Sequence, residues 1–141
     1  MRDIFKYEKG SWYPHMKPRD VEIWERFITK FPDEYSECQY DFDVGDPPPF
    51  NTLWEGGEDK NQDALYRLKI DVVGYKAGKF DVIEIKPDAN PATIGQVLSY
   101  KALYERDEDL RGPVGGVIIT DRLRPNMDWL CKEADVRLFV V

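Results

Sequence analysis

The sequence predicts a single α/β domain in which helices flank a mixed central sheet. Its 141 residues are enough for one hydrophobic core and too few for two. Apolar residues make up 42% of the chain and aromatic residues 13%, as in folded proteins rather than disordered ones. Strand patterns fill the middle of the chain, and strands alternate with helices in its second half. We therefore expect the element order α-β-β-β-α-β-α-β.

The first predicted element follows an N-terminal arm, residues 1–17, and is a helix in PRDVEIWERFITKFP. Pro18 suits the first helical position, and Pro32 ends the helix. Apolar residues recur along it at helical spacing: Val21, Trp24, Ile28 and Phe31. The next stretch, SECQYDFDVG, alternates apolar and polar residues and predicts a strand.

A long loop is predicted over residues 45–63, which are rich in proline, glycine and acids. Its aromatic residues, Phe50 and Trp54, could cap a groove and stack on bases. They could equally dock a protein partner together with the prolines.

Two predicted strands follow, at Leu65–Tyr75 and Phe80–Lys86, joined by a Lys-Ala-Gly-Lys turn. Asn90 is expected to cap the next helix, with Pro91 as its first residue. A strand in GGVIITD, a helix in RPNMDWLCKEA and a final strand in DVRLFVV complete the predicted domain.

Several kinds of site are excluded by the composition. The two cysteines, Cys38 and Cys131, are far apart and show no CxxC spacing, so neither an iron–sulfur cluster nor a zinc site is expected. The single histidine, His15, excludes sites made of several histidines, and no GxSxG, P-loop or GxGxxG motif is present. The net charge of −7 argues against a surface that binds nucleic acid all over, though not against a local basic groove.

The location expected for the chain is the cytoplasm, or the host cytoplasm if the chain is viral. No stretch approaches the roughly 20 apolar residues of a membrane span. The N-terminus, MRDIFKYEKGSWYPH, lacks the apolar core of a signal peptide.

The predicted hairpin carries an acid in each of its apolar strands, Asp71 and Glu84. A turn of two or four residues centred between Ala77 and Gly78 would place these acids opposite each other on one face. A three-residue turn would shift the register by one and send them to opposite faces. Buried carboxylates that face each other repel unless a cation lies between them.

Facing carboxylates of this kind suit Mg²⁺ or Mn²⁺, which prefers hard oxygen ligands and keeps positions for water and phosphate. Lys86 follows Glu84 by two residues, so strand alternation places both on the same face. A lysine there could orient or help to deprotonate the attacking water, or neutralise the charge of a phosphate. Together, Asp71, Glu84 and Lys86 predict metal-assisted hydrolysis of a phosphodiester.

These motifs resemble the PD-(D/E)xK nuclease superfamily, in its restriction-endonuclease-like and RecB-like members. Asp71 in KIDVVG resembles the first acid, although Ile70 replaces the proline, and Glu84-Ile85-Lys86 resembles ExK. Gln96 and Tyr100 in GQVLSYK resemble the QxxxY pair of RecB-like members. The resemblance implies an α-β-β-β-α-β core, here with an added C-terminal α-β.

The resemblance also implies roles for further residues. It assigns metal binding to Asp71, Glu84 and the carbonyl of Ile85, and catalysis to Lys86. Gln96 and Tyr100, four residues apart on one helical stripe, would hold the lysine, the water or the DNA strand. In many members an acid of the first helix adds a ligand, for which Glu25 is the candidate. His15 would approach the metal, as a histidine does in some relatives.

The expected substrate is DNA, with RNA left open, and the expected cofactor is Mg²⁺ or Mn²⁺. Candidate contacts to the phosphate backbone are Lys17, Arg19, Lys101, Arg122 and Arg124. A homodimer or a protein partner is expected to supply affinity, and small members of the superfamily often belong to viruses and mobile elements. The alternative is a catalytically silent module that keeps the nuclease fold within a larger nucleoprotein or virion assembly.

Overall fold

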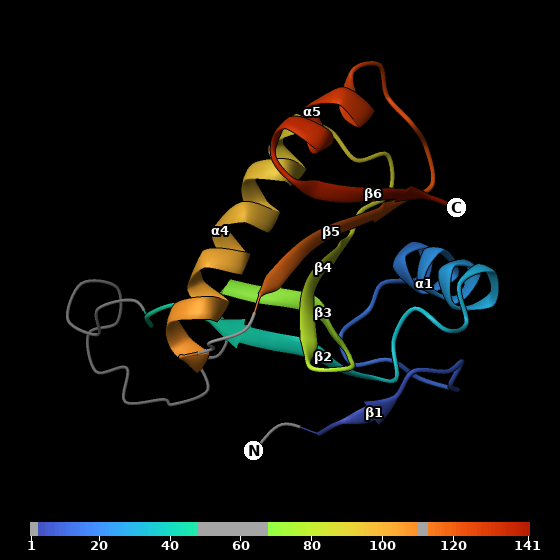
Figure 1. Ribbon diagram of the computed structural model, residues 1–141. Helices are drawn as coiled ribbons and strands as arrows, with labels where there is room; N and C mark the ends of the chain where they lie inside the picture. The colour runs from blue at the N-terminus through green and yellow to red at the C-terminus, as the bar shows by residue number, and fades with distance from the viewer. Residues whose placement is uncertain (1–2, 48–67, 110–112) are drawn as a thin grey trace, which may run out of the picture.

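The computed structural model describes residues 3–47, 68–109 and 113–141. Within these residues six strands form one sheet, in the order β1-β2-β3-β4-β5-β6, and three helices flank it (Figure 1). The strands span Phe5–Lys6, Glu37–Val44, Leu68–Lys76, Lys79–Ile85, Val114–Thr120 and Val136–Val140. The helices α1, α4 and α5 span Pro18–Lys30, Pro91–Glu108 and Met127–Glu133. Phe50 and Trp54 of the predicted loop lie outside the described residues.

The sheet is mixed, as predicted. Strands β1 to β4 pair antiparallel, while β4, β5 and β6 pair parallel, with α4 and α5 as the crossover helices. Across the described residues the predicted element order is confirmed, and the short strand β1 is an addition to it. This strand pairs Phe5 with Cys38 of β2 and Lys6 with Glu37. Its two residues are too few to show a strand pattern in the sequence.

Helix α1 covers one face of the sheet, and α4 and α5 cover the other (Figure 1). The buried stripe of α1 is offset from the predicted one and consists of Ile23, Trp24, Phe27 and Ile28. Val21 is only half-buried, and Phe31 lies at the C-cap. On the sheet, α1 packs against odd-numbered residues of β4 and β5: Ile83, Ile85, Val117 and Ile119. Within the described ranges, no helix is long and apolar enough to cross a membrane.

The hairpin of β3 and β4 has the two-residue turn that aligns its acids. Ala77 and Gly78 form the turn with φ angles of +51° and +81°, as a type I′ turn requires. The strands pair Val73 with Val82 and Tyr75 with Phe80, which confirms the symmetric register. The predicted alternative with a three-residue turn does not occur.

Helix α4 begins where the sequence predicts it. The Asn90 side chain accepts a hydrogen bond from the backbone N–H of Ala92 (2.9 Å), and Thr93 Oγ1 accepts one from the N–H of Asn90 (3.3 Å). This reciprocal cap and Pro91 at the first position fix the direction in which the helix leaves the end of β4. The cap thereby fixes the stripe that carries Gln96 and Tyr100.

An ion pair between the buried Asp81 and the exposed Arg137 joins β4 to β6 across the intervening strand. Asp81, 2% exposed, accepts hydrogen bonds at Oδ2 from Arg137 Nη2 (2.7 Å) and from the Tyr35 hydroxyl (2.8 Å). Gly115 of β5 lies beneath this contact, and a Cβ there would come within 2.3 Å of Asp81 Oδ1. A glycine is therefore needed at position 115 for the carboxylate to pass.

Candidate active site

Asp71 and Glu84 converge where β3 and β4 begin to separate. The last pair between the two strands is Val72 with Ile83, and the same register continued places Asp71 opposite Glu84. Asp71 Oδ2 accepts a hydrogen bond from the backbone N–H of Ile85 (2.9 Å), in place of a carbonyl. Glu84 is only 4% exposed, so its carboxyl group is held away from water.

Burial is the main cause of the raised pKa of both carboxyl groups. The pKa of Glu84 lies well above its usual range because of burial first and the Asp71 charge second. The pKa of Asp71 is also raised by burial, although the hydrogen bond from the N–H of Ile85 opposes the rise. Both shifts favour the protonated forms, so the doubly charged pair is costly unless a cation compensates it.

One oxygen of the pair has no hydrogen-bond partner in the described part of the chain. This atom, Glu84 Oε1, is fully buried, and an unsatisfied buried acceptor is uncommon in native structures. Among the described residues, no group of three or more His, Cys, Asp or Glu side chains could hold a metal alone. Two carboxylates with water and substrate oxygens nevertheless suffice for Mg²⁺ or Mn²⁺, so the residues present fit such an ion.

The two acids open into a pocket of about 630 Å³ between the N-terminus of α1 and the end of β4. Its lining carries both signs of charge: Asp20, Asp71, Glu84, Lys17, Arg19 and Lys86. Acids therefore lie at the floor beside cations that could face a phosphate.

Lys86 lies directly after β4, at the mouth of this pocket. Its backbone N–H donates to the carbonyl of Ile119 (2.9 Å), which fixes the chain while the side chain stays exposed. Its positive charge opposes the rise in the pKa of Glu84 and of Asp20. The structure thus brings the lysine and both acids of the predicted constellation together.

Gln96 and Tyr100 approach the acids from α4. Gln96 Nε2 donates to the Tyr100 hydroxyl (3.0 Å), and Tyr100 is 8% exposed. Burial raises the pKa of Tyr100; the bond from Gln96 opposes this rise, and the charges of Glu84 and Asp71 add to it. Tyr100 therefore lies within range of the charge of the two carboxylates, and Gln96 is bonded to it.

The acid that α1 brings to the pocket is Asp20, not the predicted Glu25. Glu25 Oε2 accepts a hydrogen bond from the Tyr13 hydroxyl (2.8 Å) and lines a different hollow. Asp20 precedes Ile23 and Trp24 by three and four residues, so it continues the buried stripe of the helix. The buried stripe of α1 was the signal in the sequence that could have identified Asp20. The predicted stripe is offset from the buried one, and this offset pointed to Glu25 instead.

His15 lines the pocket, and its nearest charged partner is an acid of β2. Its Nε2 is 3.5 Å from Asp41 Oδ2, and its side chain is 78% exposed. Asp41 falls opposite Asp71 in the register that pairs Tyr40 with Val72. The negative charge of Asp41 adds to the rise in the pKa of Asp71. Asp41 was not predicted, because the strand pattern in the sequence gave it no partner.

Three of the predicted phosphate contacts are already paired with acids. Arg19 Nη2 lies 3.2 Å from Asp121 Oδ2, and Arg124 Nη2 lies 2.8 Å from Asp88 Oδ2. Lys101 of α4 pairs with Glu105 of the same helix at 3.7 Å. Arg122 is exposed. The hydrogen bond from Arg124 is the main cause of the lowered pKa of Asp88, and the charge of Arg122 lowers this pKa further by a smaller amount.

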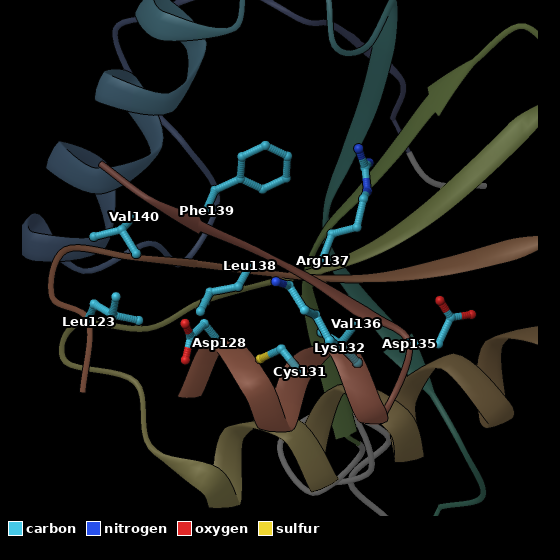
Figure 2. A pocket seen from close by; sticks show the side chains of 10 residues that line it. All are labelled: Leu123, Asp128, Cys131, Lys132, Asp135, Val136, Arg137, Leu138, Phe139 and Val140. Carbon is cyan, nitrogen blue, oxygen red and sulfur yellow. The ribbon is translucent and has the colours of Figure 1, made fainter. Parts of the chain in front are cut away.

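A second hollow of about 550 Å³ lies between α5 and β6 (Figure 2). Its lining is mainly apolar, with Leu123 and Leu138 among the side chains. Its two acids, Asp128 and Asp135, lie well apart on the two sides of the lining in this view, so they do not converge. This hollow therefore lacks the arrangement that marks the pocket at Asp71 and Glu84.

Comparison with known proteins supports the fold. A solved structure of EndoMS in complex with double-stranded DNA is similar to this chain, with a TM-score of 0.50 and 12% sequence identity. The match covers 94% of this chain and 49% of the other, so the chain spans about half the length of the EndoMS chain. No family model and no curated protein match the sequence. The mixed α/β architecture is thus shared with a protein that was solved on DNA.

Proposed function

We propose that this chain is a Mg²⁺- or Mn²⁺-dependent nuclease that hydrolyses DNA phosphodiester bonds. The observation that carries the proposal is the pair of facing carboxyl groups, Asp71 and Glu84, with one buried oxygen that has no partner among the described residues. A carboxyl group at 4% exposure is costly unless a cation or a proton compensates it. A metal ion bound between the two carboxylates would compensate this cost.

The acids, the lysine and the Gln96–Tyr100 pair have separate roles in this proposal. Asp71, Glu84 and the carbonyl of Ile85 hold the ion, which when bound would supply a Lewis acid and lower the pKa of a coordinated water. Lys86, exposed at the mouth, neutralises the charge of the phosphate or positions the water that attacks it. Gln96 and Tyr100, which are hydrogen-bonded to each other, would hold the lysine, the water or the DNA strand.

The proposed substrate is double-stranded DNA. EndoMS, whose fold this chain shares over 94% of its length, was solved with double-stranded DNA, and this supports the choice. The basic side chains Lys17 and Arg19 line the same pocket as the acids and could contact the phosphates on either side of the cut. A role in branch resolution, end trimming or other DNA processing for a virus or a mobile element is part of the proposal.

A second candidate function is a silent module that binds or organises nucleoprotein without cutting. The net charge of −7 and the acids that already pair with Arg19 and Arg124 favour it. The two candidates differ in one respect: a silent module has no need of facing buried acids.

Cleavage of DNA by matched variants tests the proposal. Wild type should cut double-stranded DNA in Mg²⁺ or Mn²⁺ and not in EDTA, while Asp71→Asn and Glu84→Gln should lose cleavage. Glu22→Gln, an exposed residue of α1, is the control and should cut as wild type does. Cleavage that survives in either active-site variant would refute the site. Parallel assays on single-stranded DNA and RNA would rank the substrates.

A further inference from the structure

An ion-paired arginine cluster adjoins the rim of the active-site pocket. It comprises Arg19, Arg122 and Arg124 with the acids Asp88 and Asp121. Arg124 binds Asp88 in a bidentate manner, with Nε 3.0 Å from Oδ1 and Nη2 2.8 Å from Oδ2. Arg19 reaches Asp121 Oδ2 at 3.2 Å. Two guanidinium groups are thus paired with two carboxylates, and the charge of Arg122 also lowers the pKa of Asp88.

This cluster is linked to the pocket by contacts of the backbone. Pro87 lines the pocket, and Asp88 is the next residue. The N–H of Asp88 donates to Asp121 Oδ1 (2.8 Å), and Asp121 in turn binds Arg19, which lines the pocket. Asp88 and the Arg124 guanidinium that binds it therefore lie directly beside residues that line the pocket.

The two acids of the cluster differ in what they hold. Asp121 accepts a backbone hydrogen bond and so supports the turn between β4 and α4. Asp88 uses both carboxylate oxygens for the fork of Arg124. The guanidinium fork fits a phosphate as well as it fits a carboxylate. The Asp88–Arg124 pair is exposed, with 35% and 47% of the side chains accessible, so water screens it and it contributes little stability.

We infer that Asp88 is an internal substitute for a nucleic-acid phosphate. In the free protein it occupies the fork of Arg124, and a phosphate of the DNA backbone displaces it when the substrate binds. The inference rests on the proposed function and adds a regulation to it: the acid masks a phosphate site and weakens binding to DNA. It also shows how a chain with a net charge of −7 can hold a basic surface beside its active site.

The variant that tests the inference is Asp88→Asn. Asp88 has a left-handed backbone conformation with φ +49°, which asparagine tolerates better than most residues, so the turn should persist. The control is Asp46→Asn, which removes the same charge from a second arginine–aspartate pair, 3.2 Å from Arg106. Arg106 lies in the last turn of α4, roughly 25 Å along the helix from Asp88.

The measurement is binding of a fluorescent DNA duplex of about 20 base pairs in EDTA, followed by anisotropy across a series of salt concentrations. Asp88→Asn should bind roughly two- to fivefold more tightly than wild type, as expected when a weak exposed pair is removed. The slope of log K against log salt should stay close to that of wild type, because Arg124 contacts the same phosphate in both complexes. Asp46→Asn should match wild type, and adding Arg124→Gln to Asp88→Asn should abolish the gain.

Three results would overturn the inference. The first is an equal change in DNA affinity in Asp88→Asn and Asp46→Asn, and the second is weaker DNA binding by Asp88→Asn than by wild type. The third is that neither wild type nor Asp88→Asn binds DNA. If Asp88→Asn fails to fold, Arg124→Gln alone serves, and an unchanged salt slope would refute the role of the fork. The proposed nuclease is judged separately by cleavage in Mn²⁺. Tighter binding by Asp88→Asn without any cleavage would refute the nuclease alone, and cleavage without the gain would refute the inference alone.

Discussion

Replacement of Glu84 by glutamine should stabilise the metal-free protein and remove much of its dependence on pH. Burial and the Asp71 charge raise the pKa of Glu84 above neutrality in the folded chain, against about 4.3 in the unfolded chain. Between these two values the folded state binds a proton that the unfolded state has released. Stability should therefore be lost as pH rises from about 4.3 toward the raised pKa.

The size of the effect follows from proton linkage. One proton taken up on folding changes the free energy of unfolding by about 1.4 kcal/mol per pH unit. From about pH 5.5 to about pH 7.5 the wild type should lose roughly 3 kcal/mol relative to Glu84→Gln. For a chain of 141 residues this corresponds to a difference of roughly 10 °C in Tm.

The assay is thermal and urea unfolding of wild type, Glu84→Gln and the exposed control Glu22→Gln, all in EDTA, at both pH values. The gap between Glu84→Gln and wild type should widen with pH, while Glu22→Gln should follow wild type. Saturating Mn²⁺ at the higher pH should stabilise wild type and leave Glu84→Gln nearly unchanged. A gap that stays constant with pH, or a Glu84→Gln protein less stable than wild type at about pH 7.5, would refute the reasoning.

Three further predictions concern other residues. Lys86→Ala should reduce cleavage at least about 100-fold while Mn²⁺ affinity is kept; a lost affinity would give the lysine a different role. Asp20→Asn should weaken Mn²⁺ binding about tenfold by calorimetry, whereas Glu25→Gln should not, and the reverse order would make Glu25 the acid of α1 that serves the metal. Arg137→Gln should lower the free energy of unfolding by about 2 kcal/mol in urea, because it leaves Asp81 buried without its main partner; an unchanged midpoint would show that water replaces the arginine.

The hairpin was predictable because its information is local. The symmetric turn sets the pairing of β3 with β4, and that pairing places Asp71 opposite Glu84. The cap of α4 was predictable for the same reason, since Asn90, Pro91 and Thr93 lie within four residues. These local signals fix the acids and the helix that carries the Gln96–Tyr100 pair.

The rest of the site depends on partners that are distant in sequence. Asp81 is buried only because Arg137, 56 residues later, reaches it across β5. Asp88 is paired only because the loop before α5 brings Arg124 to it. Asp20 depends on which stripe of α1 faces the sheet, and α1 carries apolar residues on more than one stripe. Periodicity cannot choose among these partners, because tertiary packing decides between them.

Calorimetric titration of Mn²⁺ into wild type and Glu84→Gln at about pH 7.5, in two buffers of different ionisation enthalpy, tests the central claim most directly. The account predicts one binding event for wild type, with release of roughly one proton from the carboxyl pair, and no such event for Glu84→Gln. Equal binding by both proteins, or no binding by wild type, would contradict a metal site at Asp71 and Glu84.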